Sequence, residues 1–348
     1  MATLKNRAAY MTAVGKMELR EIETPAPGPC EVLLRTEYVG VCGSDVHFFE
    51  SGVRRGKPFA LPFILGHECS GTVMEVGAEV RHLQKGDRVT IEPQQTCGQC
   101  KPCKSGRYNM CADVKFPSVP PYDGMLRNYM TFPAHLCYRL PDAVSTRDGA
   151  LIEPLAVGLE AAKRGEVELG KTVAILGSGC IGLTTLLACK ARGASRIIVA
   201  DLYPNRLEKA RAFGATDVVC AADGDTTEQI WKLLGGEGPD VVFETAGSRV
   251  TATQSGKLVG RCGVIVMVGN INGETPMDFI DLMYKEGEIR TIYRYKNNFP
   301  TAIAAVAEGK IDISGIISHS YDFDQIVKAF EDVRKNRENV TKAVIKMT

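Results

Sequence analysis

The segment from Lys171 to Asp201 constrains the fold of this chain more than any other. A short β-branched and aliphatic run at 172–176 leads directly into a glycine-rich turn at 177–182, and helix-forming residues follow. A second apolar run, at 197–200, ends on the acid Asp201. This order of strand, glycine turn, helix, strand and acid is the dinucleotide-binding fingerprint. The segment therefore predicts the first strands of a doubly wound parallel sheet that binds a dinucleotide.

Each residue of the fingerprint has its own role toward the dinucleotide. Gly177 permits the tight turn, Gly179 lets the backbone approach the pyrophosphate, and Gly182 lets the helix lie close to the strand. The free N–H groups at the start of the helix then face the phosphates. Asp201 would bond the ribose hydroxyls and repel a 2′-phosphate, so we expect NAD rather than NADP, a preference that Arg206 could soften. The other predicted cofactor contacts are Cys180, Ile181, Val268, Tyr293 and Arg294.

The pattern of apolar runs changes near residue 155, which predicts two domains in a chain of 348 residues. Before that point, short β-like runs such as 71–76 and 87–91 are broken by Gly and Pro, as is typical of an all-β, barrel-like module. From there to about residue 295, apolar strands alternate with helical stretches, which indicates a doubly wound parallel sheet. The tail holds two helical patterns and a last strand at 343–346, and the sequence leaves open which domain it joins.

Charge and cysteine content exclude several classes of partner. The 42 Lys and Arg nearly balance the 41 Asp and Glu, so no overall field favours nucleic acid or an acidic membrane. The N-terminal residues lack the apolar core of a signal peptide, and no segment has the roughly 18 unbroken apolar residues of a membrane span. We therefore expect a cytoplasmic protein whose twelve cysteines are reduced.

Four of these cysteines form a compact group. The spacing Cys97-x2-Cys100-x2-Cys103-x7-Cys111 offers four thiolates to a tetrahedral zinc ion. An iron–sulfur cluster is the competing interpretation, but the last spacing differs from that of bacterial ferredoxins and no second cysteine set follows. Since sulfur would occupy all four positions, this zinc should hold the lobe at 94–113 together rather than take part in catalysis.

A second set of possible metal ligands is dispersed along the chain. Cys42, His67, Glu68 and Glu153 would supply a thiolate, an imidazole and carboxylates. Each of them alone is unremarkable, since a single His or an adjacent His-Glu pair is usually structural. Together they could leave a zinc ion with the open position that catalysis requires. We therefore predict two zinc ions per chain, one structural and one catalytic.

These features together resemble the zinc-dependent medium-chain alcohol dehydrogenase family along essentially the whole chain. Within the family, the chain is most similar to the polyol branch, the sorbitol (L-iditol) and xylitol dehydrogenases. Beside the cysteine group and the fingerprint, the segments that carry the resemblance are 42–47, 66–68, 120–124, 152–155 and 293–295. The resemblance implies an α/β fold with a GroES-like, β-rich catalytic domain at 1–154 and 296–348 and a Rossmann domain at 155–295. It also implies a homotetramer or a homodimer.

The resemblance assigns roles to the dispersed ligands and their neighbours. Cys42, His67 and Glu68 match the catalytic zinc ligands, and Glu153 matches an acid that approaches the same zinc directly or through water. Asp45 is expected to orient His67 by a hydrogen bond. The candidate proton relays are Ser44 with His47, or Glu153 through water, although Ser44 is equally compatible with an ordinary turn hydroxyl.

The resemblance also implies a polyol site. Arg294 and Tyr295 match an Arg and a Tyr that line it, and Phe48, Phe116 and Glu153 are further predicted substrate contacts. Phe48 stands where the animal sorbitol enzymes usually have tyrosine, which leaves the preferred polyol open. The expected reaction transfers a hydride from a secondary alcohol of sorbitol, xylitol or L-iditol to NAD and yields the ketose. The alternatives are another secondary alcohol such as threonine, or a non-enzymatic structural or regulatory protein with the same fold.

Overall fold

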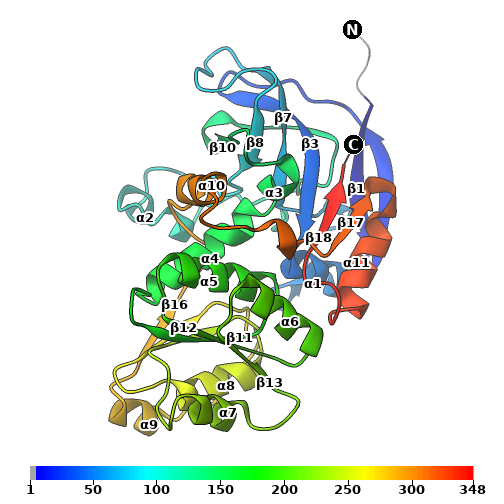
Figure 1. Cartoon of the computed structure of the whole chain (residues 1–348). Coiled ribbons are helices and arrows are strands. Elements are labelled where there is room, and N and C mark those ends of the chain that lie inside the picture. Colours follow the sequence, from blue (N-terminus) through cyan, green and yellow to red (C-terminus); the bar gives the residue numbers. More distant parts are fainter. Residues whose placement is uncertain (1–4, 348) are drawn as a thin grey trace. The chain divides into compact units, whose positions relative to one another are not determined.

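The computed structural model describes residues 5–347, which form two compact units (Figure 1). Unit 1 comprises the chain through Glu153, residues 299–309, and the tail from Ile313 onward. Unit 2 comprises Pro154–Asn298 and Lys310–Asp312. The sequence-based boundaries lie after residues 154 and 295, beside the points at which the chain passes between the units.

Unit 1 is built on two mainly antiparallel sheets, and the one parallel pair among their described strands is β17 with β18. The smaller has the order β2-β1-β6, and the larger has the order β10-β8-β7-β3-β18-β17, with β9 also paired to β3. The strand bounds are β1 Asn6–Ala13, β2 Lys16–Ile22, β3 Glu31–Val41, β6 Phe63–Ile64, β7 Glu68–Val76, β8 Arg88–Ile91, β9 Tyr129–Pro133, β10 Cys137–Arg139, β17 His319–Asp322 and β18 Ala343–Lys346. A two-stranded hairpin is formed by β4 Val53–Arg54 and β5 Lys57–Pro58. The β-rich first module predicted from the short apolar runs is therefore present.

The tail of the chain returns to unit 1. Its last strand, β18, lies antiparallel against β3, with Ala343 opposite Val41 and Ile345 opposite Val39 (Figure 1). Helix α11, Ile326–Lys335, covers this region. Its Phe330 ring packs against the ring of Phe49, with 5.3 Å between the ring centroids. This pairing settles the question that the sequence left open.

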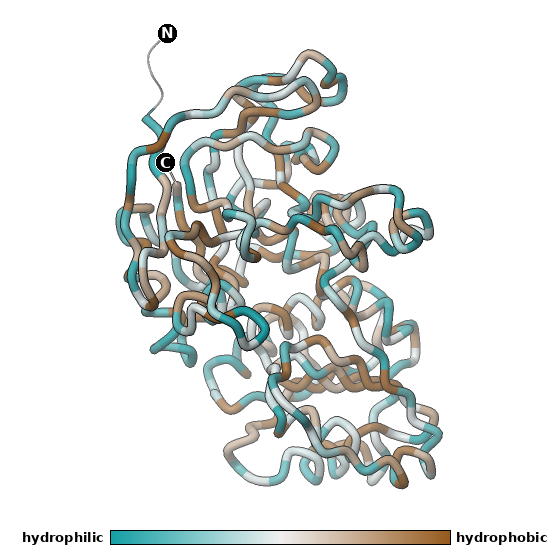
Figure 2. Tube along the Cα trace, turned by 180° about the vertical axis from the view of Figure 1, so that it is seen from behind, coloured by the Kyte–Doolittle hydropathy of each residue, from teal (hydrophilic) through white to brown (hydrophobic). Residues whose placement is uncertain are grey.

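Unit 2 contains the predicted parallel sheet, with the order β13-β12-β11-β14-β15-β16. Its strands are β11 Thr172–Leu176, β12 Arg196–Asp201, β13 Asp217–Cys220, β14 Val241–Glu244, β15 Val264–Met267 and β16 Glu288–Thr291. The strand order reverses at β11, between β12 and β14, and this is where open α/β sheets bind their ligands. The central strands β11 and β14 are apolar except for Thr172 and Glu244 at their ends, as expected where helices cover both faces of such a sheet (Figure 2).

Helices connect the strands. Their bounds are α1 Gly43–Ser51, α2 Lys101–Lys104, α3 Thr146–Gly149, α4 Ile152–Arg164, α5 Cys180–Ala191, α6 Pro204–Phe213, α7 Thr226–Leu233, α8 Arg249–Leu258, α9 Phe279–Tyr284 and α10 Phe299–Ala307. Short 3-10 turns lie at η1 Tyr108–Met110, η2 Ala134–Leu136, η3 Ser314–Ile316 and η4 Phe323–Gln325. Among residues 5–347, no helix is both long and apolar enough to span a bilayer.

Candidate metal centres and dinucleotide site

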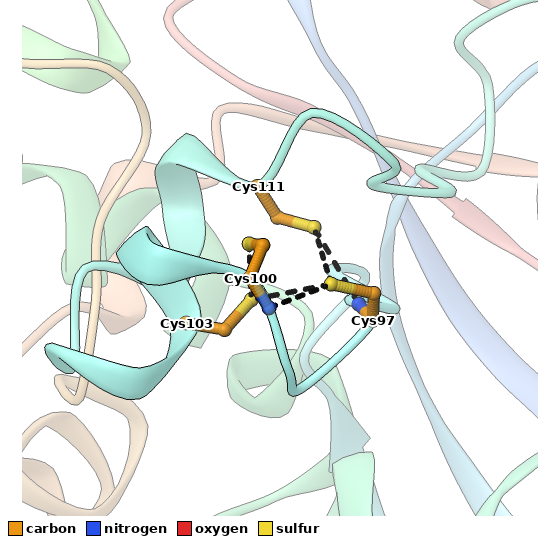
Figure 3. A group of neighbouring side chains, drawn as sticks. All are labelled: Cys97, Cys100, Cys103 and Cys111. Atoms are coloured by element: carbon orange, nitrogen blue, oxygen red, sulfur yellow. Dashed lines mark hydrogen bonds between the residues drawn. The ribbon is translucent and has the colours of Figure 1, made fainter.

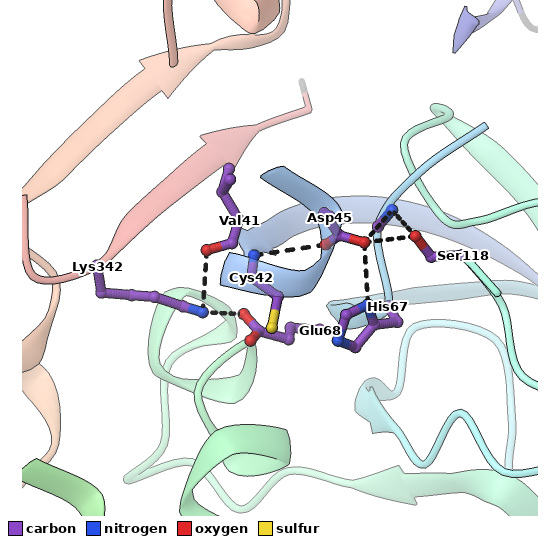
Figure 4. A network of polar contacts seen from close by, with 8 residues as sticks. Val41, Cys42, Asp45, His67, Glu68, Ser118 and Lys342 are labelled. Carbon is purple, nitrogen blue, oxygen red and sulfur yellow. Dashed lines mark hydrogen bonds and ion pairs between the residues drawn. The ribbon is translucent and has the colours of Figure 1, made fainter. Parts of the chain in front are cut away.

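Cys42, His67 and Glu68 come together in unit 1, where β3 ends and β7 begins (Figure 4). The antiparallel register places Gly40 opposite Glu68, so Cys42, just after β3, lies near His67, just before β7. The Cys42 sulfur, an imidazole nitrogen of His67 and a carboxylate oxygen of Glu68 all lie within 4.8 Å of one another. Two strand ends thus bring three donors of different chemistry to one point.

A buried hydrogen-bond chain fixes the His67 ring. Asp45, on α1, places its Oδ1 3.2 Å from His67 Nδ1, and the Ser118 hydroxyl donates to the same oxygen (Figure 4). Burial opposes ionisation of both partners, yet the Asp45 charge raises the pKa of His67 and the imidazole lowers that of Asp45. Phe116 covers the ring, with 5.3 Å between centroids. The nitrogen that faces away from Asp45 is left as the one to bind a metal.

The donors fit zinc. A thiolate, an imidazole and a carboxylate are ligands that zinc takes, and a metal-bound His usually has its other ring nitrogen on a carboxylate, as His67 has here. Three protein ligands correspond to a catalytic zinc site, which keeps one position open. Glu153 is buried in the first turn of α4 but does not belong to the close three-residue group. Its approach to the metal therefore stays a prediction.

We expect Asp45→Asn to weaken zinc binding at this site by about tenfold or more, because a neutral amide orients and polarises the His67 ring less well than a carboxylate. Competition with a chromogenic chelator measures the affinity. Glu50→Gln, which neutralises an acid on the same helix outside the site, is the matched control. An unchanged zinc affinity in Asp45→Asn would show that the hydrogen bond holds the His67 ring in place but does not contribute to zinc binding.

The four predicted cysteines form the second centre, in the lobe that contains α2 and η1 (Figure 3). Their sulfur atoms converge, with 3.4 Å between those of Cys100 and Cys103 and 3.6 Å between those of Cys111 and Cys97. Backbone N–H groups of Gln99 and Cys100 lower the pKa of the Cys97 thiol to about 6, which favours the thiolate that a metal binds. The set fits a closed zinc site with four sulfur ligands.

A buried acid fastens this lobe to the large sheet. Tyr108, in η1, donates to Glu92 at 2.6 Å, and Tyr138, in β10, donates to the other oxygen at 3.0 Å. Burial raises the pKa of Glu92 although both phenols stabilise its charge. The sequence offered no signal for this bridge, because its three members come from separate segments.

The fingerprint residues of unit 2 adopt the backbone shape that their sequence predicts. Gly177 has a φ of 106°, and Gly182 lies so close to the Gly177 carbonyl oxygen that a Cβ would overlap it. Asp201 ends β12 beside this turn and accepts hydrogen bonds from Ser178 N at 2.6 Å and Tyr203 N at 3.1 Å. The Arg206 guanidinium lies 3.9 Å from the same carboxylate. The turn, the acid and helix α5 are therefore assembled at the carboxyl ends of the inner strands β11 and β12.

The remaining predicted residues are distributed between the two units. In unit 1, His47 is exposed on α1, Ser44 is half-buried there, and the Phe48 ring lies edge-on to Phe59 at 5.6 Å. In unit 2, Tyr295 is fully buried, and Arg294, with a φ of 58°, stacks on Tyr293 at 4.7 Å. The half-buried residues near the fingerprint include Cys180, Ile181 and Val268.

Sequence analysis missed two polar partners of the ligands. Ser118 is buried with a φ of 68°, donates to Asp45 and accepts from Gly66 N at 2.9 Å. Lys342 is buried and forms an ion pair with Glu68. The position of Lys342 directly before an apolar strand is a weak sequence signal for its contact with Glu68. The sequence around Ser118 contains no signal for its contact with Asp45.

Known proteins resemble both units. Residues 28–142 match the alcohol dehydrogenase GroES-like domain, and residues 180–308 match the zinc-binding dehydrogenase family. Human sorbitol dehydrogenase is 39% identical over 95% of this chain and 93% of its own. An Escherichia coli oxidoreductase/dehydrogenase of unknown specificity, described as involved in membrane biogenesis, is 42% identical, with a TM-score of 0.94 over 99% of this chain and 100% of its own.

A third relative bears on the cofactor. The solved structure of a zinc-binding dehydrogenase from Sinorhizobium meliloti, bound to NADP, is 29% identical, with a TM-score of 0.90 over 99% of both chains. Dinucleotide binding by a relative agrees with the assembled fingerprint in unit 2. Since both domain families match and the human relative is similar over almost its whole length, this chain belongs to the zinc-dependent medium-chain dehydrogenases.

Proposed function

We propose that this protein is an NAD-dependent zinc polyol dehydrogenase, which oxidises a secondary alcohol of sorbitol, xylitol or L-iditol to the ketose. The observation that carries the proposal is the group of half-buried Cys42 with buried His67 and Glu68, whose donors match a zinc site with an open position. The similarity to human sorbitol dehydrogenase supports the polyol class. The four-cysteine group supports a second, structural zinc.

The chain's own residues prepare the site for this reaction. Zinc, when bound, supplies a Lewis acid that favours loss of the alcohol proton. Asp45 holds the imidazole of His67, and Phe116 covers that ring. Ser44 Oγ and the exposed His47 imidazole, on the helix that starts after Cys42, are the proposed path for the proton to solvent. The fingerprint of unit 2 would hold the dinucleotide, which would supply the hydride acceptor.

A spectrophotometric assay of NADH formation with sorbitol, xylitol and threonine tests the function. We expect turnover of at least one polyol and none, or far less, of threonine. Turnover of threonine alone would move the protein to another branch of the family, and no turnover of any alcohol by protein that holds two zinc ions would contradict the proposed activity.

Arg294 is the proposed specificity residue for the neighbouring hydroxyls of the polyol. Its guanidinium has five N–H donors, and its removal should leave substrate hydroxyls without partners. We expect Arg294→Ala to cost on the order of 2 kcal/mol in transition-state binding of sorbitol or xylitol, measured as kcat/KM. A simple secondary alcohol without further hydroxyls should lose much less.

One control variant and one comparison between the two alcohols interpret this result. Arg261→Ala removes an exposed arginine of the same unit and should leave kcat/KM for both alcohols unchanged. If Arg294→Ala lowers kcat/KM equally for the polyol and the simple alcohol, Arg294 supports the fold or the cofactor instead. The stacking of its guanidinium on Tyr293 makes that second outcome physically reasonable.

A homodimer or homotetramer is part of the proposal. β16 pairs only with β15 at the edge of the described sheet, and the preceding helix α9 exposes Phe279, Ile280, Met283 and Tyr284 by 63–75%. We expect Tyr284→Glu to lower the molar mass measured by light scattering, while Leu169→Glu, at an equally exposed site outside α9, does not. A monomeric wild-type protein would contradict the assembly.

We also propose that the enzyme is cytoplasmic. No disulfide joins any of its twelve cysteines, all of which lie within the described residues, and this suits a reducing compartment. Recovery of the protein in an oxidising compartment on cell fractionation would contradict this location.

A further inference from the structure

Lys342 places a buried ammonium group directly behind the candidate zinc ligand Glu68 (Figure 4). Only 3% of the Lys342 side chain and 2% of the Glu68 side chain are exposed. The ammonium forms an ion pair with Glu68 Oε2 and lies 3.3 Å from the carbonyl oxygen of Val41, the residue before Cys42. Lys342 precedes β18, so the returning tail delivers this charge to the metal centre.

The backbone makes room for the Glu68 carboxylate on the Lys342 side. Gly40 lies opposite Glu68 in the antiparallel register, and a Cβ on Gly40 would overlap Glu68 Oε2, the oxygen that contacts Lys342. The Glu68 carboxylate also lies within reach of the Cys42 sulfur and the His67 imidazole. The same carboxylate that pairs with Lys342 would therefore also be needed to hold a metal ion at the three donors.

Lys342 and a bound metal ion would compete for the same Glu68 carboxylate. Before metal binds, the ion pair offsets the cost of burying both charges, a cost of several kcal/mol per ion when a charge is unpaired. A metal ion that takes Glu68 must share this carboxylate with Lys342, and the ammonium repels the metal at close range. His67 pairs with the carboxylate of Asp45 and not with a cation.

We propose that Lys342 competes with zinc for Glu68 and makes Glu68 the most weakly held of the three ligands. Lys342 is thus a positioning residue, which lowers the zinc affinity of the catalytic site and lets one ligand be displaced during turnover. The inference rests on the metal centre used by the proposed function and not on the polyol assignment. It differs from the usual role of a group behind a metal ligand, which strengthens metal binding.

Zinc affinity of the full-length protein distinguishes the two roles. We expect Lys342→Met, which keeps the chain length and removes the charge, to bind zinc at the catalytic site about tenfold more tightly in chelator competition. Lys346→Met, on the neighbouring strand β18 with its side chain exposed, should bind as the wild type does. Unchanged or weaker binding by Lys342→Met would overturn the proposal.

A double-mutant cycle locates the effect at Glu68. With Glu68→Gln there is no carboxylate to compete for, so adding Lys342→Met should change the zinc affinity by much less than it does in the wild type. An equal tightening in both backgrounds would mean that Lys342 acts only through its general field, and the competition for Glu68 would be rejected.

A second variant keeps the proposal testable if Lys342→Met does not fold. Lys342→Arg retains the charge and can hold the carboxylate through two hydrogen bonds, so it should compete more strongly and weaken zinc binding by a few-fold. Zinc binding at or above wild-type strength in Lys342→Arg would contradict the competition. Because these measurements report affinity, they stand apart from the substrate panel, and either can fail alone.

Discussion

Replacing Cys42 with serine is expected to lower kcat/KM by about 10³-fold or more, because the proposed catalytic zinc would supply several kcal/mol of transition-state stabilisation. The hydroxyl of serine is a poor zinc ligand at neutral pH. Only His67 and Glu68 would remain as ligands, and the Glu68 carboxylate also pairs with the ammonium of Lys342. Elemental analysis should find two zinc ions per wild-type chain and one in Cys42→Ser.

The retained ion should be the one in the four-cysteine lobe. Cys97→Ser breaks that closed site and should lower the melting temperature, whereas Cys42→Ser should change it much less. Cys30→Ser, which alters an exposed cysteine outside both centres, is the control and should retain two ions and full activity. Freshly purified, active wild-type protein with one zinc or none would refute the two-site assignment.

The parts of the fold that sequence predicts well are those specified by neighbouring residues. The glycine turn, α5 and Asp201 follow one another along the chain, and the turn needs only its own glycines to reach its shape. The four cysteines are similarly close in sequence, so their spacing alone brings the sulfur atoms together. In both cases the local pattern contains almost all of the required information.

The destination of the tail could not be read in this way. β18 is short and apolar and would suit the edge of either sheet, and its partner β3 lies at the other end of the chain. Only the complete set of strand pairs decides between the two sheets. The same long-range pairing delivers Lys342 to Glu68, which explains why the position of this lysine before β18 is only a weak signal for the contact.

The metal ligands and their supporting residues differ in how far they can be predicted. Cys42, His67 and Glu68 are recognisable because few side chains bind zinc, and their motif is shared with a known family. Ser118 and Glu92 act only through hydrogen bonds, and such side chains are common at the surface of any protein. Their roles depend on burial, which the sequence does not specify residue by residue.

Cofactor preference should be controlled by one charge in unit 2. We expect Asp201→Ser to raise the ratio of kcat/KM for NADP to that for NAD by about 100-fold, because hydrogen bonds to a charged group contribute about 1.5–3 kcal/mol and the repulsion of a 2′-phosphate is lost. Arg206, whose guanidinium lies 3.9 Å from the Asp201 carboxylate, is close enough to pair with the added phosphate. Initial rates measured over a range of NAD and of NADP concentrations, with the polyol at one fixed concentration, give the ratio.

Asp201 also accepts backbone hydrogen bonds from Ser178 and Tyr203, so its loss could loosen the turn as well as change the charge. A loosened turn would weaken both cofactors alike, whereas the charge effect must change their ratio. Asp217→Ser, which removes a half-buried acid from the neighbouring strand β13, controls for general damage to the sheet. In the Asp201→Ser background, Arg206→Ala should abolish most of the gain with NADP, since it removes the guanidinium that lies beside position 201. A wild-type enzyme that uses NAD and NADP with equal efficiency would show that Asp201 serves the turn and not the ribose.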